Sequence, residues 1–212
     1  MTRNGAFTEP QTAEQYEIGL KSEWFDGALS ASATYFHLTK SNLTIPIPGD
    51  PVHVDQIGEA RSQGFEFDLS GQITDYWRII ANYAYTDAEI TKDRDELGGS
   101  RNTGNRLPGV PEHGGGLWSQ LDFENGFGFG AGLYFATERE ADQENTVQLP
   151  GYVRFDAALS YKRSIGPSRV TLQVNLNNLL DQEYFEASNF CRRNCIIPGA
   201  PRTVLGQIRV EF

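Results

Sequence analysis

The chain has 212 residues, a net charge of −10 at pH 7 and 12% aromatic residues. Its length suffices for one domain with a sizeable core, and its negative charge argues against nucleic acid as a partner, because binding to phosphates needs an excess of Lys and Arg. No run of about 18 apolar residues occurs, which excludes a transmembrane helix but leaves transmembrane β-strands open, since their alternating residues average to a polar value.

Four β-strands are predicted in the first half of the chain, because apolar and polar residues alternate there with period two. These strands span about Glu14–Trp24, Gly27–Asn42, Gly58–Ser70 and Tyr76–Glu89. The Asp26-Gly27 pair predicts a tight turn between the first two, since Asp-Gly readily adopts positive φ. A Pro-rich loop over Pro46–Pro51 is predicted before the third strand, and a long polar loop is predicted over residues 90–109, after the fourth.

Five further strands are predicted in the second half. They span about Pro111–Phe123, Phe127–Phe135, Val153–Lys162, Val170–Asn177 and Thr203–Phe212. The Asn125-Gly126 pair predicts another hairpin turn. Within the strand that follows this turn, Gly128, Gly130 and Gly132 alternate with apolar residues. This pattern indicates an inner wall too crowded for larger side chains.

Two regularities predict how the strands are arranged. The connections alternate between short turns and long polar loops, which is typical of up-and-down outer-membrane barrels and not of sandwiches. The polar face of each strand also carries charged residues, such as Glu66 and Asp68 or Arg154 and Asp156, and a wet lumen accommodates them. We therefore predict an all-β protein made of about nine antiparallel, up-and-down transmembrane β-barrel strands. A soluble antiparallel sheet is the alternative.

The odd number of strands predicts that residues 1–212 are only part of a barrel. Single-chain bacterial barrels contain an even number of strands, so a periplasmic Phe212 would put Met1 on the outer side of the membrane. The first residues also lack the apolar segment of a signal peptide. An open sheet in lipid would leave unpaired backbone groups at both edges. We therefore expect the C-terminal part of a larger barrel.

Six stretches of the sequence resemble the C-terminal part of TonB-dependent outer-membrane receptors, in particular the ferric siderophore receptor branch. These stretches are Gln11–Lys21, Ser62–Asp68, Asn82–Ala88, Arg106–His113, Asn175–Asp181 and Pro198–Phe212. They occur in the family's order and cover nearly the whole chain. The resemblance implies a barrel of about 22 strands with a plugged lumen, of which this chain supplies the distal strands. The plug domain, the signal peptide and the N-terminal barrel strands would be absent from it.

The resemblance also implies a function and a location. The whole receptor would take up iron–siderophore complexes across the Gram-negative outer membrane, surrounded by outer-membrane lipid and with its C-terminus in the periplasm. The TonB energy-transducing complex would drive uptake through the missing N-terminal part. This fragment is not expected to transport anything by itself. We expect no enzymatic activity, no cofactor and no nucleic-acid partner.

Candidate site residues lie in the loops and at the strand ends. Cys191 and Cys195 belong to an exported loop, and an oxidising compartment favours a disulfide between them over two free thiols. Siderophore receptors use aromatic and Arg side chains near the extracellular mouth. The corresponding ligand-binding candidates are Tyr134, Arg139, Tyr184, Phe190, Arg192 and Arg193. For each aromatic candidate, a place in the aromatic girdle at the membrane interface is the alternative.

Two other functions are left open. A self-contained small outer-membrane barrel with a structural or adhesive role would need an even number of strands and its own signal peptide. An outer-membrane hydrolase built on His37, His53 or His113 has no support in the sequence beyond the presence of these histidines. The three histidines are widely scattered, and no metal site is predicted from them.

Overall fold

The computed structural model describes residues 2, 5–47, 50–93, 102–188 and 196–212. This part of the chain is all-β and contains 13 strands. The strands are β1 (Thr12–Trp24), β2 (Leu29–Ile47), β3 (Asp50–Thr74), β4 (Trp77–Lys92), β5 (His113–Asp122), β6 (Phe127–Ala136), β7 (Arg139–Glu140), β8 (Gln148–Leu149), β9 (Tyr152–Ile165), β10 (Ser168–Asn177), β11 (Phe185–Ser188), β12 (Ile196–Pro198) and β13 (Thr203–Glu211). A search of these residues for a helix long and apolar enough to cross a membrane finds none.

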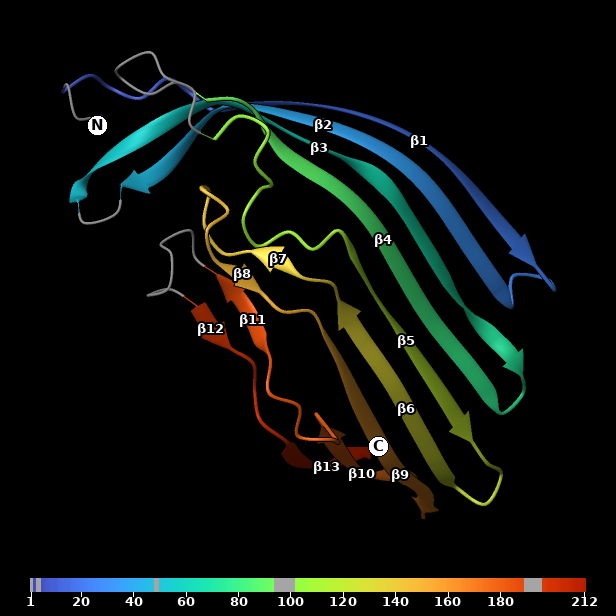
Figure 1. Cartoon of the computed structure of the whole chain (residues 1–212). Helices are drawn as coiled ribbons and strands as arrows, with labels where there is room; N and C mark the ends of the chain where they lie inside the picture. The colour runs from blue at the N-terminus through green and yellow to red at the C-terminus, as the bar shows by residue number, and fades with distance from the viewer. Residues whose placement is uncertain (1, 3–4, 48–49, 94–101, 189–195) are drawn as a thin grey trace.

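Nine of the strands form one antiparallel sheet in the order β1-β2-β3-β4-β5-β6-β9-β10-β13. The sheet is strongly curved and therefore has a concave and a convex face (Figure 1). β1 and β13 are its edges, each with a single neighbouring strand among the described residues. The prediction of about nine antiparallel strands is confirmed, and the sheet formed by these residues is open rather than closed into a barrel.

Apolar residues line up across the strands on the convex face. Ile18 pairs with Tyr35, and Tyr35 pairs with Phe65. Phe65 in turn pairs with Tyr85 on β4. Because paired residues on neighbouring strands point to the same face, the period-two pattern of the sequence becomes one continuous apolar surface. Ile18 is 74% exposed, so this surface has no cover from the described part of the chain.

The connections give the sheet two different ends. Short turns join β1 to β2, β3 to β4, β5 to β6 and β9 to β10, and we call this the turn end (Figure 1). Long segments join β4 to β5, β6 to β9 and β10 to β13 at the opposite, loop end. The first turn uses positive φ at Phe25, Asp26 and Gly27, as the Asp-Gly signal predicted. The predicted alternation of short and long connections holds for these seven connections but fails between β2 and β3, where only two residues separate the strands at the loop end.

β2 and β3 extend far beyond the strands predicted there. β2 ends at Ile47 and β3 begins at Asp50, so a hairpin stands where the sequence predicted a Pro-rich loop starting at Pro46. Even Pro46 is in register, opposite Val54. The loop prediction was wrong because the residues around the prolines, such as Thr44, are largely β-branched and favour extended pairing.

The long connections at the loop end fold back as small strands. β7 pairs with β8 and β11 pairs with β12, and both pairs lie on the concave side of the sheet (Figure 1). The sequence analysis predicted neither pair. Ile90 near the end of β4 is fully buried against Leu43 and Leu107. This buried apolar contact therefore holds the β4–β5 connection, through Leu107, against β2 and β4.

Candidate functional site

Three of the predicted ligand candidates lie in the described part of the chain, and the structure brings them together. Tyr134 is on β6, Arg139 forms the start of β7, and Tyr184 directly precedes β11. All three belong to one network of aromatic rings and guanidinium groups on the concave side of the loop end. The remaining candidates lie outside the described residues: Phe190, Arg192, Arg193 and the cysteines Cys191 and Cys195.

Arg139 is buried, with only 2% of its surface exposed. Its Nη2 donates hydrogen bonds to the backbone oxygens of Phe185 and, at 3.1 Å, Glu186, both on β11. Its Cζ lies 5.8 Å from the ring centroid of Tyr152, within the range of a cation–π contact. Its Nη1 has no hydrogen-bond partner among the described residues. Arg139 therefore joins β7 to β11 across 46 residues of sequence.

Tyr184 is also buried and is held on three sides. Its ring centroid lies 4.5 Å from that of Tyr152. On another side, a Cβ on Gly199 would lie 2.2 Å from Tyr184 Cζ, so a larger residue than glycine does not fit there. The Tyr184 hydroxyl accepts a hydrogen bond of 3.2 Å from Nη1 of Arg154 on β9. Tyr184 therefore fixes the chain before β11 to the wall of the sheet.

Arg154 and Asp156 complete the network, although the sequence analysis did not select them as site residues. Arg154 Cζ lies 4.8 Å from the ring centroid of Tyr134, and its Nη2 donates to Asp156 Oδ2 at 3.0 Å. Asp156 Oδ1 accepts a hydrogen bond of 2.8 Å from the backbone N–H of Asn178. The sequence signal for them is a pair of opposite charges two residues apart in a predicted strand. That signal predicted only that this face of the strand lines a wet lumen.

Asn178 closes the turn that follows β10 and is 2% exposed. Its Nδ2 donates to the carbonyls of Gln182 and Ala200 at 2.9 and 3.0 Å. Its Oδ1 accepts from the Gln182 N–H at 2.8 Å. Its φ of 53° lies in the left-handed region, which Asn tolerates better than most residues. A single side chain thus ties the start of the β10–β13 connection to its end.

The other two long connections are also bonded to each other. The Arg106 N–H donates to Asn145 Oδ1 at 2.8 Å, and Asn145 Nδ2 donates back to the Arg106 carbonyl at 3.0 Å. Asn105 Nδ2 donates to the Gln143 carbonyl at 2.8 Å. The β4–β5 and β6–β9 connections are thereby held as one body, next to the network of Arg139.

The three described candidates differ in what they offer to a ligand. Tyr134 is 37% exposed, whereas Arg139 and Tyr184 are 2% and 7% exposed. The partners of Arg139 and Tyr184 are other groups of the protein, as given above. A role of Tyr134 in ligand contact stays a prediction that the exposed ring permits, because aromatic faces bind cations and flat groups.

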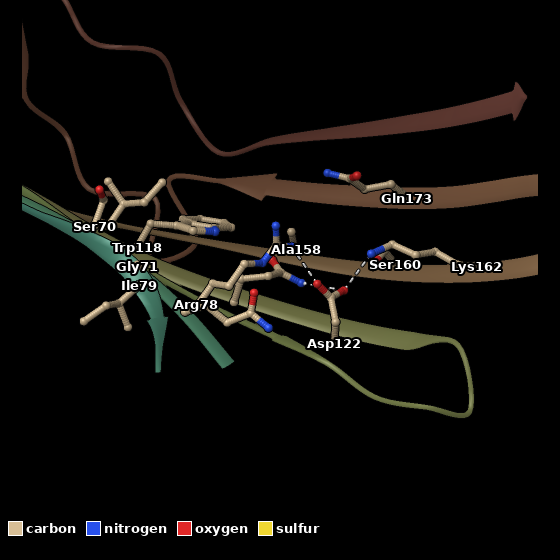
Figure 2. A pocket seen from close by; sticks show the side chains of 13 residues that line it. Ser70, Gly71, Arg78, Ile79, Trp118, Asp122, Ala158, Ser160, Lys162 and Gln173 are labelled. Atoms are coloured by element: carbon tan, nitrogen blue, oxygen red, sulfur yellow. Dashed lines mark hydrogen bonds and ion pairs between the residues drawn. The ribbon is translucent and has the colours of Figure 1, made fainter. Parts of the chain in front are cut away.

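A hollow of about 500 Å³ lies on the concave face near the turn end. Asp122 accepts hydrogen bonds from Arg78 Nη2 at 2.7 Å and Lys162 Nζ at 2.8 Å (Figure 2). Arg78 and Lys162 are open to solvent, with side-chain exposures of 56% and 44%. The rest of the lining includes the polar residues Ser70, Gln72, Gln120, Ser160 and Gln173 and the apolar residues Ile79, Ile80, Trp118 and Ala158. The wall is therefore mixed, and its three charged side chains are all partly exposed.

The glycines of β6 make room for neighbouring side chains beside this hollow. A Cβ on Gly130 or on Gly132 would lie 2.4 Å from a ring atom of Trp118. A Cβ on Gly128 would lie 2.4 Å from Ser160 Oγ. The predicted crowded inner wall is confirmed, and much of the crowding comes from the indole ring of Trp118.

The three histidines have separate partners. These partners are Gln63 and Thr39 for His37, Asp50 for His53 and Tyr83 for His113. The hydrogen bond between the His53 ring and the Asp50 carboxylate, at 2.9 Å, lowers the pKa of Asp50. Within the described ranges, no group of three or more His, Cys, Asp and Glu side chains is placed to hold a metal ion.

Comparison with known proteins gives one family. The model of the family described as "TonB dependent receptor-like, beta-barrel" matches residues 2–179. The metal-pseudopaline receptor CntO of Pseudomonas aeruginosa is 36% identical over 98% of this chain and 29% of its own length. The probable TonB-dependent siderophore receptor PiuA of Acinetobacter baumannii is 35% identical over 86% of this chain and 25% of its own length.

Solved structures agree with these relatives. The crystal structure of the siderophore receptor PiuA from Acinetobacter baumannii has a TM-score of 0.78 and 33% identity, covering 94% of this chain and 28% of that one. The unliganded ferric citrate transporter FecA has a TM-score of 0.76 and 26% identity, covering 92% of this chain and 30% of that one. The chain thus spans less than a third of the length of these relatives.

Proposed function

The chain belongs to the TonB-dependent receptor β-barrel family, and on this premise we propose that it forms part of the wall of an outer-membrane receptor for iron–siderophore complexes. The observation that carries the proposal is the likeness to the siderophore receptor PiuA, at 33% identity over 94% of the chain. The family consists of receptors and transporters rather than enzymes. We accordingly propose no catalysis for this chain.

The two faces of the sheet support a membrane location. The convex face carries the continuous apolar rows, which are suited to lipid, and the concave face carries the charged and polar residues, which are suited to a wet lumen. Aromatic pairs also stand on the convex face. Tyr35 packs on Phe65, and Phe127 packs on Tyr161 at the turn end, with ring centroids 5.2 and 4.8 Å apart. The pair at the turn end matches an aromatic girdle of outer-membrane barrels.

The loop lengths support an orientation. Outer-membrane barrels place short turns in the periplasm and long loops outside the cell. We therefore propose that the turn end, and with it Phe212 at the end of the last strand, faces the periplasm. The loop end with the Arg139 network then faces the siderophore.

The two open edges support the proposal that further strands complete the barrel. β1 and β13 each leave one row of backbone N–H and C=O groups without a partner strand in the described sheet. In lipid, such unpaired groups cost several kcal/mol each, on the order given by transfer of amides to apolar media. Residues 1–212 would then be one C-terminal wall segment, and ligand uptake would need the other strands, a plug and the TonB complex.

Uptake of radioactive iron tests the proposal. The protein, in the form that the cell makes, is expressed in a Gram-negative strain lacking its own siderophore receptors and is given labelled iron as ferrioxamine B, ferrichrome or citrate. We expect uptake of at least one complex, and its loss when TonB is deleted. If the protein binds no siderophore of a broad panel, and if growth of the strain does not depend on TonB, the proposed function is wrong.

The exposed ring of Tyr134 provides the first residue-level test. Replacement of Tyr134 by Ala is expected to weaken binding of the transported complex by about 5- to 150-fold, the range of one lost aromatic contact of roughly 1–3 kcal/mol. Tyr134→Phe, which keeps the ring under Arg154, is the matched control. Equal binding by both variants and the unchanged protein would remove Tyr134 from the ligand site.

A further inference from the structure

The paired strands β11 and β12 are fixed to the sheet by side chains from distant parts of the chain. β11 pairs with β12 through Ala187 opposite Ile197, but neither strand belongs to the nine-stranded sheet. Figure 1 shows the pair beside β7 and β8, on the concave side of the loop end. Its position relative to the wall therefore depends on contacts other than the strand ladder of the sheet.

Arg139 supplies the contact between these strands and β7. One guanidinium nitrogen donates to two successive carbonyls of β11, those of Phe185 and Glu186. Hydrogen bonds from a charged donor are about twice as strong as neutral ones, and burial excludes the water that would compete for the carbonyls. Arg139 is 2% exposed, so this condition is met.

Arg154 supplies a second, separate contact with the wall. It donates to the Tyr184 hydroxyl, and the Tyr184 ring packs at a tilt against Tyr152, the same ring that lies under Arg139. The backbone of Tyr184 also accepts a hydrogen bond of 2.8 Å from the Gly199 N–H, just after β12. Both strands of the pair are thus anchored at their base, and the hydrogen bonds of Arg139 extend the anchoring along β11.

We propose that Arg139 is a positioning residue for ligand capture. Through the Phe185 and Glu186 carbonyls it fixes the β11–β12 pair beside β7–β8, and this fixed position shapes the concave mouth that the ligand enters. The proposal rests on the function proposed above. It assigns to Arg139 a role through the backbone of β11 instead of the direct ligand contact expected from the sequence.

The chemistry of the site favours Arg over Lys. A planar guanidinium can reach two carbonyls and lie over the Tyr152 ring at once, whereas an ammonium is a compact, strongly hydrated charge. Arg139→Lys should therefore restore only part of the restraint. Arg139→Met keeps an unbranched apolar side chain, removes both hydrogen bonds and leaves the Tyr184 contacts in place.

Hydrogen–deuterium exchange tests the positioning directly and needs no ligand. The protein is purified in detergent in the form that the cell makes, as wild type, Arg139→Met, Arg139→Lys and Arg163→Met. Arg163 lies at the turn end of β9, away from the network of Arg139, and its side chain is exposed. Arg163→Met therefore controls for the loss of an Arg side chain elsewhere in the protein. In Arg139→Met we expect amide exchange in residues 185–188, 196, 197 and 199 to rise by about 10-fold or more, the effect of about 1.5–3 kcal/mol for a charged hydrogen bond, with β6 and β9 unchanged.

Unchanged amide exchange of the β11–β12 pair in Arg139→Met would overturn the proposal. If Arg139→Met does not fold, Arg139→Lys decides: faster exchange confined to the β11–β12 pair supports the positioning role, and wild-type exchange overturns it.

A binding measurement then separates this proposal from the function on which it rests. Ferrioxamine B is the first probe, and any complex taken up in the uptake experiment follows. We expect Arg139→Met to weaken ferrioxamine B binding about 10-fold and Arg139→Lys to weaken it less. Arg163→Met should bind as the wild type does, and the melting temperature should be the same for all of these proteins. Unaltered affinity with faster exchange would overturn the role in ligand capture. If the wild type binds no siderophore, the proposed function fails, while the exchange data still decide whether Arg139 fixes β11.

Discussion

At the loop end Arg154 and Asp156 pair with side-chain exposures of 27% and 9%, whereas at the turn end Arg78 and Asp122 pair with exposures of 56% and 26%. Both pairs stand on the concave face of the same sheet and use the same residue types. Only the loop-end pair continues into rings, carbonyls and a buried Asn. The turn-end pair ends in solvent beside an open hollow (Figure 2).

Burial, rather than the presence of charge, therefore decides how far an ion pair on the wall restricts its neighbours. Exposed pairs contribute little because water and salt screen them. Buried polar groups are costly to leave unpaired, so each partner at the loop end restricts the next one. The loop end can therefore hold long connections in one arrangement, while the turn end leaves a surface free to meet another partner.

Removal of the Asn178 side chain should destabilise the loop end more than any of the substitutions that follow. Asn178→Ala leaves the Gln182 N–H and the carbonyls of Gln182 and Ala200 without their present partner, and it puts Ala at positive φ. We expect a loss of about 3 kcal/mol in the free energy of unfolding, measured by urea titration in lipid vesicles.

Asn175 provides the matched control for this change. Its Oδ1 accepts one hydrogen bond of 2.7 Å, from Gln173 on the same strand. Asn175→Ala should cost less than about 1 kcal/mol, since a single side-chain pair is lost in a partly exposed place. A similar loss in both variants would contradict a special role of burial at the loop end.

A methyl group at Gly199 should have the next largest effect. The added Cβ would lie 2.2 Å from the Tyr184 ring, so the ring must leave its place between Gly199 and Tyr152. We expect Gly199→Ala to destabilise the protein by about 2 kcal/mol and to speed amide exchange near Tyr184. Gly206→Ala is the control because nothing lies within 4 Å of its added Cβ. Equal effects of the two substitutions would show that Tyr184 moves aside freely.

Neutralisation of Asp122 should have the smallest effect. Asp122→Asn weakens the contacts with Arg78 and Lys162, and both cations remain solvated. The expected loss in unfolding free energy is below about 1 kcal/mol and should shrink further when the salt concentration is raised. A loss as large as that of Asn178→Ala, unchanged by salt, would place a buried charge at the turn end and remove the contrast between the two ends.

The strands of the sheet could be predicted from the sequence because their pattern is local. Alternation at Tyr16, Ile18 and Leu20 reports directly which face of β1 is apolar, and the Asn125-Gly126 pair marks a turn by backbone preference alone. These signals require no knowledge of neighbours. The strand number, the antiparallel order and the alternating connections followed from them.

The loop-end network could not be predicted in the same way because its partners are far apart in sequence. Arg139 is predicted as a ligand contact from its position at a strand end, yet its hydrogen bonds run to β11, and no periodic pattern indicates such a contact. Asn178 is not singled out by any local pattern, although its side chain bonds the carbonyl of Ala200, 22 residues away. The β2–β3 hairpin was missed for a different reason, since the prolines were weighted above the β-branched residues around them.

Trp118 lies against the glycines of β6 beside the turn-end hollow, and this placement gives the wall an intrinsic optical probe. The chain has only two other tryptophans, Trp24 and Trp77, which are 45% and 37% exposed. The emission of an indole shifts with the polarity around it, so a protein with both outer tryptophans replaced by Phe would report on the lumen through Trp118 alone. Filling or emptying of the barrel interior could then be followed by fluorescence in real time, without any attached label.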